Sequence, residues 1–345
     1  MKKIMMVGPK STGKGGISTV IKNFIHYFPT NENWQIHYLF SWDEKNKLFY
    51  ALRTFCQLLV RTRVQKMDIV HFHVSQDASF YRKALLKKAT KKGTKIIFHM
   101  HAPDFKAFYT EASRGERRYI RKVLDGVDLV VALGEDWKEY YQTLTQTKVI
   151  AINNAVFVPV ESEYQVNSIN VLTFGRICER KGSHDIVLLA KRVQRKIPEI
   201  RFHLYEDTDE TTPKVIERMK QLNCENIELH GWTRDQTELL KDCALHLLPS
   251  YHEGIPMAIL ETMACGIPNM ATDVGGIGQV IKHQENGLLV RPGDIEYMEQ
   301  AIIRFFSNPE KRKRFSINAK QTIDEHYSME AYLQNWESVY DSLSG

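Results

Sequence analysis

Residues 247–276 read LLPSYHEGIPMAILETMACGIPNMATDVGG: a strand end, a short helix and a second strand in succession. Pro256 fits the first turn of the helix, because its missing N–H would have had no partner there. Gly254 lets the backbone approach a ligand closely. The free N–H groups at the start of such a helix bind anions. The stretch predicts an α/β fold in which an anion binds where this helix begins.

Two glutamates, Glu253 and Glu261, enclose the segment EGIPMAILE. Glu261 is expected about a turn and a half inside the helix, where its carboxylate can accept hydrogen bonds from ribose hydroxyls. Glu253 precedes the helix and is expected to face a cleft. One carboxylate suits a nucleoside and the other suits a sugar, so the predicted anion is the phosphate of a phosphorylated sugar.

Positive charges are expected upstream, because a helix dipole contributes only about 0.3–2 kcal/mol toward an anion. Residues 170–175 (NVLTFG) are predicted to form a buried strand, which Arg176 and Lys181 follow. Ligands of α/β sheets bind beyond the carboxyl ends of the strands. Taken alone, this spacing is more typical of a solvated loop. Beside the two glutamates, it predicts a cationic site for a diphosphate.

These motifs carry a family resemblance. GRICERKG (175–182), HGW (230–232), the stretch 247–276 and ENGLLVRPGD (285–294) resemble family 4 of the retaining nucleotide-sugar glycosyltransferases, which have the GT-B fold. The resemblance is close over the second half of the chain and looser over the first. It implies two Rossmann-like, doubly wound parallel-sheet domains that face each other across a cleft.

The resemblance also implies roles for individual residues. Arg176 and Lys181 would bind the donor diphosphate, Glu261 the ribose, and Glu253 would lie beside the transferred sugar. The remaining donor-binding candidates are backbone or small positions around the two glycine-containing loops, namely Gly15, Gly16, Gly254, Ile255, Pro256 and Met257. Arg176, Lys181, Glu253 and a histidine of the first domain would form the catalytic set.

A chain of 345 residues exceeds what one core usually supports, so two domains are expected. We predict an acceptor-binding domain over residues 1–160 and a donor-binding domain over residues 168–325, and the resemblance implies that a helix of about 328–345 packs back on the first. Apolar runs alternate with amphipathic stretches, as in parallel sheets. The predicted strands are 3–8, 36–40, 68–74, 95–100, 129–133, 149–152, 170–175, 202–206, 227–231, 245–250 and 268–273.

The composition is that of an ordinary globular protein, with 43% hydrophobic and 26% charged residues. The five cysteines are scattered and lack a C-x-x-C pair, which argues against a disulfide framework or a zinc site and for the cytoplasm. The first residues, MKKIMMVG, are too short for a signal sequence. No apolar run reaches the length of a membrane span.

Most of the basic excess lies in the first domain, in residues 44–66, 81–95 and 105–122. Within the first stretch Leu48, Leu52, Phe55 and Leu59 fall on one helical face with lysines and arginines around it. Two interpretations remain open: a core helix with a solvated basic face, or a patch that binds anionic lipid. Nucleic acid is not favoured, because no recognition motif accompanies the charge.

Two motifs suggest other chemistry and are rejected. Gly8, Gly13 and Lys14 match a nucleotide P-loop, but Gly15 stands where a serine or threonine must hold magnesium. The triplet Asp207-Thr208-Asp209 resembles a metal-binding D-x-D motif, but it lies in an acidic loop that is more typical of a solvated surface. With two cations on the diphosphate, neither a metal nor another cofactor is expected.

Residues 95–104 (KIIFHMHAPD) place His99 and His101 at the carboxyl end of a strand. Alternation along the strand points both side chains the same way, toward the cleft. The resembled family has a histidine here that contacts the donor sugar, and we favour His101 over His99. His71 and His73 are expected near the same cleft, and their role stays open.

The predicted function is that of a retaining hexosyl- or N-acetylhexosaminyltransferase, with a UDP-sugar as donor. The acceptor would be a glycan or a polyprenyl-diphosphate-linked glycan in cell-surface polysaccharide synthesis, such as capsule, at the inner face of the plasma membrane. Two alternatives remain: a nucleotide-sugar isomerase or phosphorylase of the same fold, and a non-catalytic nucleotide-sugar-binding partner of another transferase. Gln279 departs from the family, which commonly has a glutamate there.

Overall fold

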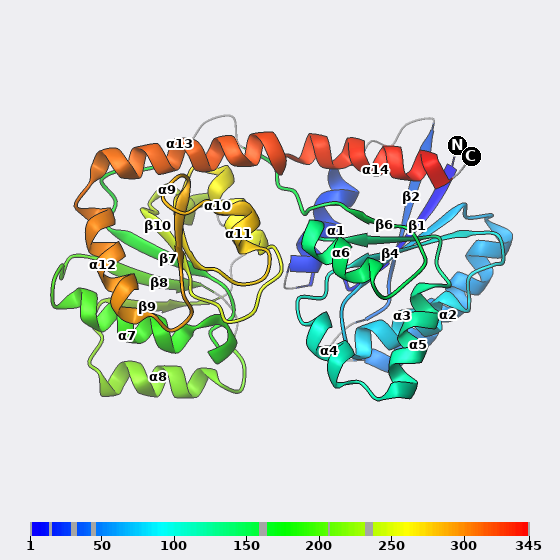
Figure 1. Ribbon diagram of the computed structural model, residues 1–345, viewed down its shortest axis with the longest axis horizontal. Coiled ribbons are helices and arrows are strands. Elements are labelled where there is room, and N and C mark those ends of the chain that lie inside the picture. Colours follow the sequence, from blue (N-terminus) through cyan, green and yellow to red (C-terminus); the bar gives the residue numbers. More distant parts are fainter. Residues whose placement is uncertain are drawn as a thin grey trace. The chain divides into compact units, whose positions relative to one another are not determined.

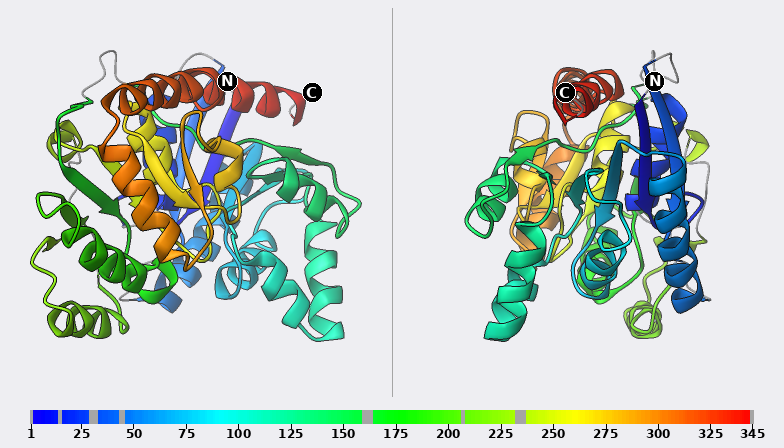
Figure 2. Two further views of the ribbon diagram at one scale, coloured as in Figure 1. Left: turned by 60° about the vertical axis from the view of Figure 1, so that its left-hand side comes forward. Right: turned by 90° about the vertical axis from the view of Figure 1, so that its right-hand side faces the viewer.

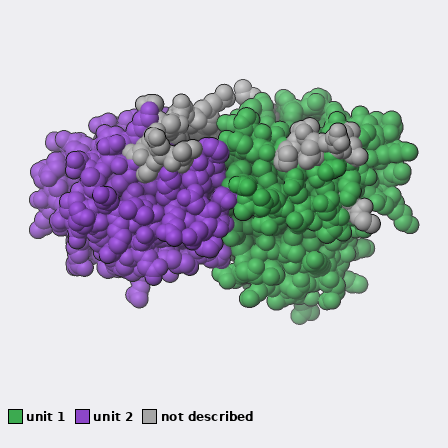
Figure 3. Space-filling model, turned by 90° about the horizontal axis from the view of Figure 1, so that it is seen from above, with its two compact units in different colours: residues 1–155, 329–345 green, residues 156–328 purple. Residues whose placement is uncertain are grey.

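The computed structural model describes residues 2–13, 16–28, 33–42, 46–158, 164–205, 208–231 and 237–343. For residues 47, 48, 237 and 238 it describes the backbone alone. The chain divides into two compact units, residues 1–155 with 329–345 and residues 156–328. Figure 3 shows these units in green and purple. Each is built on its own sheet.

The first unit contains a six-stranded parallel sheet of order β2-β1-β3-β4-β5-β6. The chain moves outward from β1 to β2 on one side and from β3 to β6 on the other. The carboxyl ends of β1 and β3 therefore flank the point where the winding reverses, which is the usual ligand position in such sheets. The strands are β1 Lys2–Gly8, β2 Trp34–Phe40, β3 Ile69–Val74, β4 Lys95–Met100, β5 Leu129–Ala132 and β6 Val149–Ala151.

Helices cover both faces of this sheet. One core holds Phe72, Phe98 and Phe105, and the other holds Phe24 and Trp336. The alternation of side chains along β3 sends Val70, Phe72 and Val74 to the first core and turns His71 and His73 the other way. The helices are α1 Gly16–Tyr27, α2 Lys47–Val64, α3 Ala78–Lys87, α4 Phe105–Glu111, α5 Arg114–Leu124, α6 Glu135–Gln142 and α14 Met329–Leu343.

The C-terminal helix α14 belongs to the first unit. Its buried residues Met329, Tyr332, Trp336 and Tyr340 recur every three or four positions and form one apolar stripe. The ring of Phe24 on α1 meets Tyr332, Trp336 and Tyr340 edge to face. Figures 1 and 2 show α14 beside the strands that begin the chain. Lys2 Nζ of β1 lies 3.5 Å from Asp341 Oδ1 of α14.

The second unit contains another six-stranded parallel sheet, of order β12-β11-β10-β7-β8-β9. Here the winding reverses between β7 and β10, so the loops that leave these two strands must meet. The strands are β7 Asn170–Phe174, β8 Arg201–Tyr205, β9 Ile227–His230, β10 Leu245–Leu248, β11 Asn269–Thr272 and β12 Gly287–Val290. The helices are η1 Glu179–Lys181 (3-10), α7 Ser183–Gln194, α8 Thr212–Gln221, α9 Thr237–Lys241, α10 Met257–Ala264, α11 Ile277–Val280, α12 Ile295–Phe306 and α13 Pro309–His326.

The predicted fold class of two doubly wound parallel sheets is confirmed. Every predicted strand is present, with ends shifted by at most two residues. The strand β12 was missed, because its four residues begin with Gly287 and precede Arg-Pro-Gly, which leaves too short an apolar run for a pattern.

The apolar face expected on α2 is buried only in part. Phe55 and Leu59 pack on the core and Leu58 is fully buried, but Leu52 is 62% exposed. The buried face of α2 thus contains Leu58 and not Leu52. The side chain of Leu48 is outside the described residues. Within the described part of the chain, none of the helices combines the length and the hydropathy needed to cross a membrane.

Candidate active site

Lys181 and Glu253 form an ion pair at the reversal point of the second sheet. Lys181 Nζ lies 2.6 Å from Glu253 Oε1, and the two side chains are 16% and 8% exposed. Lys181 ends the 3-10 turn after β7, and Glu253 follows β10. The structure thus brings together two of the predicted catalytic residues.

The turn that carries Lys181 depends on Gly182. This residue has φ +72°, and a Cβ on it would lie 2.1 Å from the carbonyl oxygen of Pro249. Only glycine can pass so close to the end of β10 in the left-handed conformation. The tight approach holds the β7 loop against the segment that leads to Glu253. A hydrogen bond at the surface also joins the two loops: Arg180 Nη1 donates to the carbonyl oxygen of His252 at 2.9 Å.

A second close contact fixes the backbone of Glu253 and Gly254. Gly275, in the turn after β11, has φ +56°, and a Cβ on it would lie 1.8 Å from the Glu253 carbonyl oxygen. The N–H of Gly276 donates to the Gly254 carbonyl oxygen at 3.0 Å. Three loops, after β7, β10 and β11, therefore converge on Glu253.

The helix α10 begins four residues after Glu253, one residue later than predicted. Pro256 is the N-cap with φ −70° and ψ 129°, and Met257 is the first helical residue. The expectation that Pro256 occupies the first turn is wrong, because its extended ψ leaves its carbonyl free to accept the first helical hydrogen bonds, from Ile259 and Leu260.

The predicted donor-binding side chains around this helix start are buried. Ile255, Pro256 and Met257 all lie inside the unit, so this segment can offer a ligand its backbone N–H groups rather than its side chains. Glu261 lies one turn further along α10 and is half-buried. Gly254 is half-buried as well. The first turn of α10, where N–H groups generally lack a carbonyl partner one turn earlier in the helix, thus begins four residues after Glu253.

Arg176 follows β7 and is exposed. Its positive charge reaches Asp209 of the rejected D-x-D triplet. Burial raises the pKa of Asp209, but hydrogen bonds from Thr211 and the charge of Arg176 outweigh it and lower the pKa overall. Asp209 Oδ1 accepts from the N–H and the hydroxyl of Thr211, at 2.8 and 2.7 Å. Asp209 thus shapes the turn before α8, and Asp207 lies outside the described residues.

His246 on β10 was not recognised from the sequence. It is fully buried; its Nδ1 lies 2.5 Å from Asn269 Oδ1 of β11, and its Nε2 accepts from the Phe174 N–H of β7. Burial lowers the pKa of His246 to about 4, against the opposing effect of the Asn269 hydrogen bond. The neutral ring joins three strands behind the ion pair. A histidine inside the apolar run LHLL (245–248) was the available signal.

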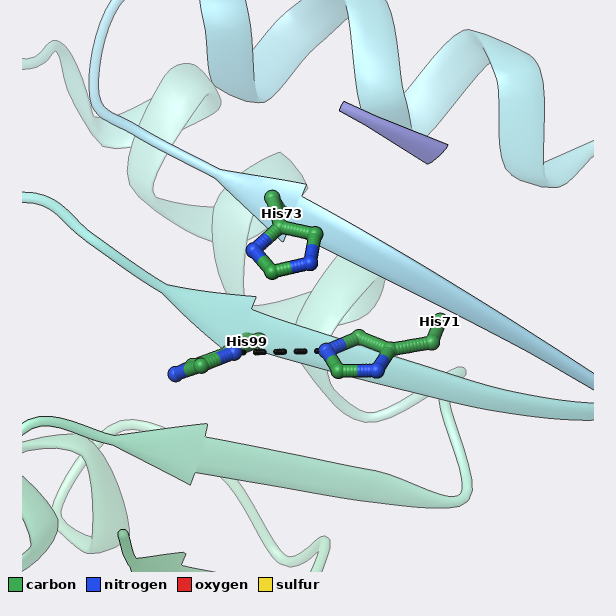
Figure 4. Close-up of side chains that lie close together, drawn as sticks. All are labelled: His71, His73 and His99. Atoms are coloured by element: carbon green, nitrogen blue, oxygen red, sulfur yellow. Dashed lines mark hydrogen bonds between the residues drawn. The ribbon is translucent and has the colours of Figure 1, made fainter. Parts of the chain in front are cut away.

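Four histidines gather at the carboxyl ends of β3 and β4 in the first unit. His73 Nδ1 lies 2.9 Å from His101 Nε2, and His71 Nε2 lies 3.3 Å from His99 Nδ1. Figure 4 shows the second contact as a dashed line, with His73 above it. Trp336 stacks on His71 at 4.4 Å between ring centroids, and the Tyr340 hydroxyl lies 2.8 Å from His71 Nδ1. The C-terminal helix thus closes one side of this cluster.

His101 is the member nearest the surface. It is 6% exposed, whereas His99 is fully buried. Burial lowers the pKa of His101 to about 3, and burial also lowers that of His71 to about 3 and those of His73 and His99 well below the usual value. All four rings are therefore neutral at pH 7. Gly16, another predicted residue, begins α1 and is exposed, while Gly15 lies outside the described residues.

Two family models match the chain. The model described as Glycosyltransferase Family 4 matches residues 15–157, and the model described as Glycosyl transferases group 1 matches residues 160–322. The two matches are consecutive and together cover most of the sequence.

Curated relatives resemble the chain at moderate identity. An uncharacterized glycosyltransferase of Haemophilus influenzae is 24% identical over 61% of this chain, which thereby spans only 61% of that protein's length. An uncharacterized 41.2 kDa protein in the cps region of Klebsiella pneumoniae is 23% identical over 95% of this chain and 98% of that protein. The N-acetyl-alpha-D-glucosaminyl L-malate synthase of Bacillus anthracis is 24% identical over 80% of this chain and 75% of that protein.

Solved structures share the fold. Sucrose-phosphate synthase from Thermosynechococcus elongatus aligns with a TM-score of 0.82 at 16% identity and covers 99% of both chains. Anabaena Alr3699/HepE in complex with UDP-glucose aligns with a TM-score of 0.79 at 15% identity, over 99% of this chain and 100% of that one. With both halves matched by family models and with two doubly wound parallel sheets, this chain belongs to the family 4 glycosyltransferases of GT-B fold.

Proposed function

We propose that the protein transfers a hexosyl or N-acetylhexosaminyl group, with retention of anomeric configuration, from a UDP-sugar to a glycan or lipid-linked acceptor. The observation that supports this most is the Lys181–Glu253 pair in front of α10, with Nζ and Oε1 2.6 Å apart. The pair joins a cation and a carboxylate, and α10, whose first turn is the kind of helix start that binds anions, begins four residues after Glu253.

The leaving group is a nucleoside diphosphate, on which negative charge grows as the glycosidic bond breaks. Lys181 and Arg176 would neutralise that charge, and the first N–H groups of α10 would add hydrogen bonds. The dipole of α10 alone contributes about 0.3–2 kcal/mol, so most of the stabilisation must come from the two side chains. With these cations no divalent metal or other cofactor is required.

The carboxylates of Glu261 and Glu253 would bind the two ends of the donor, the ribose and the transferred sugar. Glu261, half-buried in α10, would accept hydrogen bonds from the ribose hydroxyls. Glu253 would exchange its contact with Lys181 for hydroxyls of the transferred sugar when the diphosphate takes over Lys181. The Lys181–Glu253 pair would thus keep the site neutral until donor arrives. Gly15 and Gly16, which carry no side chain, would leave room for donor phosphate or acceptor.

His101 would contact the transferred sugar as a neutral imidazole. Its pKa of about 3, due to burial, makes it a hydrogen-bonding group rather than a proton donor at pH 7. No covalent nucleophile is needed if the departing phosphate oxygen takes the proton of the acceptor hydroxyl on the same face of the sugar. That front-face displacement suits a site rich in cations.

Uridine is favoured as the donor nucleoside because the structure of Alr3699/HepE, which shares the fold, is described with UDP-glucose. N-Acetylglucosamine is one candidate sugar, since the Bacillus anthracis relative is named for its transfer to malate. The Klebsiella pneumoniae relative, from a cps region, favours a role in capsule or related surface polysaccharide.

A lipid-linked acceptor would require the enzyme to work at a membrane, and α2 offers a surface for that. Its exposed side combines large apolar and basic residues, namely Phe49, Leu52, Arg53, Val60, Arg63 and Val64. Each basic residue near anionic lipid contributes about 1 kcal/mol, and the apolar side chains can enter the interface. We propose reversible binding of this α2 surface at the cytoplasmic face of the plasma membrane.

The direct experiment is a screen of nucleotide diphosphate sugars for binding and for slow hydrolysis. A true donor at a hundred times its dissociation constant stabilises the fold by about 2.7 kcal/mol, which a thermal shift detects. Release of UDP in the absence of acceptor supports transfer. Formation of a sugar phosphate or an isomerised sugar would instead favour a phosphorylase or isomerase, and binding without turnover a non-catalytic partner.

A further inference from the structure

Two histidines and a glutamate meet at the edge of the second sheet, away from the ion pair of the candidate active site. His203 lies on β8, and Glu228 and His230 lie on the edge strand β9. His203 pairs with Glu228 and Tyr205 with His230 in the parallel register, so all these side chains share one face of the sheet.

The nitrogen and oxygen atoms of this group lie close enough together to share one ion. His203 Nδ1 lies 3.1 Å from His230 Nε2, and these nitrogens lie 3.6 and 3.7 Å from Glu228 Oε2. Zinc binds imidazole nitrogen and carboxylate oxygen at about 2.0–2.2 Å, so two ligand atoms of a tetrahedral site stand roughly 3.3 Å apart. One observed separation is shorter than that value and two are longer. Small rotations of the three side chains would bring all three atoms to the distance that a bound ion requires.

Supporting hydrogen bonds fix the ring of His203 in the orientation that a metal ligand needs. Asn170 Nδ2 donates to Asp242 Oδ2 at 2.8 Å, which turns Asn170 Oδ1 toward His203 Nε2 at 3.1 Å. His203 Nε2 must therefore carry the proton, and the lone pair of Nδ1 faces His230 and Glu228. Metal-binding histidines are typically held by such a hydrogen bond on the other ring nitrogen.

The second histidine is held by an aromatic contact. The ring of His230 stacks on Tyr205 with centroids 4.2 Å apart and planes 11° from parallel. The side chains of His203, His230 and Glu228 are 16%, 32% and 57% exposed, which gives an ion a path from solvent. The histidine cluster of the first unit differs in this respect, because His71 and His99 are fully buried.

We propose that His203 Nδ1, His230 Nε2 and a carboxylate oxygen of Glu228 bind a divalent transition-metal ion of the zinc type. Two neutral imidazoles and one carboxylate match the ligands that zinc prefers, and a water molecule would complete a tetrahedral set. The ion would tie the edge strand β9 to β8 and stabilise the second unit. It would not touch the diphosphate, so this inference is independent of the proposed transfer reaction.

The test is zinc binding by the full chain without an affinity tag, after treatment with a chelator and dialysis. Titration calorimetry is expected to give one tight site per chain, and zinc to raise the unfolding temperature. Cobalt in place of zinc is expected to give the visible absorption of a four-coordinate ion. His230→Gln and Glu228→Gln should each weaken zinc binding at least tenfold.

Two further variants make the test specific to this geometry. Asn170→Leu removes the support of His203 and should weaken zinc about 10–100-fold. His326→Gln is the matched control, because it removes an exposed histidine 3.7 Å from Glu325 that lacks a second histidine partner in the described structure. Unchanged zinc stabilisation in His230→Gln, or equal losses in His326→Gln, would overturn the proposal. The unfolding temperature of each metal-free variant reports whether it folds.

Discussion

The ammonium group of Lys181 and the carboxylate of Glu253 are in contact although 72 positions separate them in the sequence. The contact follows from the strand order, because β7 and β10 are neighbours at the point where the winding of the sheet reverses. Gly182 and Gly275 allow the loops to come close enough. The pair thus places a cation and an acid at the edge where ligands of such sheets bind.

Replacing Lys181 with alanine is expected to abolish most of the turnover. Loss of one preorganised electrostatic group costs about 3–4 kcal/mol of transition-state stabilisation, or roughly a hundredfold or more in rate. Initial rates with saturating donor measure this. Lys220→Ala, an exposed lysine on α8, is the control. A Lys181 variant within threefold of wild type would refute the assigned role.

Because that change leaves Glu253 without its cation, the unfolding temperature is measured alongside the rate. The paired variant Lys181→Met with Glu253→Gln removes both charges at once. It is expected to be more stable than Lys181→Ala and equally inactive, which separates loss of chemistry from loss of fold.

Turnover is expected to be insensitive to EDTA, since Lys181 and Arg176 supply the charge that a metal would supply. The same treatment would empty the proposed zinc-type site on β9. A lower unfolding temperature with unchanged rate would therefore be consistent with both proposals. Activity that EDTA abolishes and magnesium restores would contradict metal-independent transfer.

The α2 surface is expected to bind anionic vesicles. Co-sedimentation with vesicles containing phosphatidylglycerol should decrease when Leu52 and Val60 become serine and decrease further when Arg53 becomes glutamate, since the first change removes apolar contact and the second reverses a charge. Binding should also weaken in high salt. Equal sedimentation of wild type and variants would show that α2 is merely a solvated surface.

Stability is expected to decline in mild acid because of the buried histidines. Burial lowers the pKa values of His71 and His101 to about 3, whereas an unfolded histidine titrates near about 6.5. Below pH 6.5 the unfolded chain therefore binds more protons than the folded chain. The free energy of unfolding then decreases as the pH is lowered. Above pH 6.5 this contribution is complete and constant.

Urea unfolding at pH 7.5, 6.5 and 5.5 measures this effect, in a range where carboxylates contribute little. His71→Gln is expected to reduce the slope between pH 6.5 and 5.5. The matched control is His326→Gln, which removes an exposed histidine of α13 and should leave the slope unchanged. A free energy of unfolding that is constant from pH 7.5 to 5.5 would contradict neutral burial of the cluster.

Much of the fold could be predicted because each buried strand except β12 is a distinct apolar run between turn residues. The candidate site could be predicted as a set of motifs but not as a geometry. Sequence spacing contains no strand order, so the contact between Lys181 and Glu253 had no local signal. The same holds for Gly275, whose contact with the Glu253 carbonyl depends on the position of β11.

Other differences have local physical causes. A proline is compatible with both the N-cap and the first turn, so composition could not place Pro256. Leu52 was placed on one apolar face of α2 with Phe55 and Leu59, and whether that face is buried was left open. Burial depends on where α2 meets its neighbours, which helical periodicity does not give, and Leu52 is exposed. Predicting the proposed zinc-type site would have required the register between β8 and β9, because His203 on β8 lies far from His230 on β9 in the sequence.

A crystal structure with UDP bound tests the central claim most directly. The account predicts the diphosphate within hydrogen-bonding distance of Lys181 Nζ, Arg176 and the first N–H groups of α10, with the ribose hydroxyls on Glu261. UDP bound at another place, with Lys181 still paired to Glu253 and the start of α10 facing solvent, would contradict it.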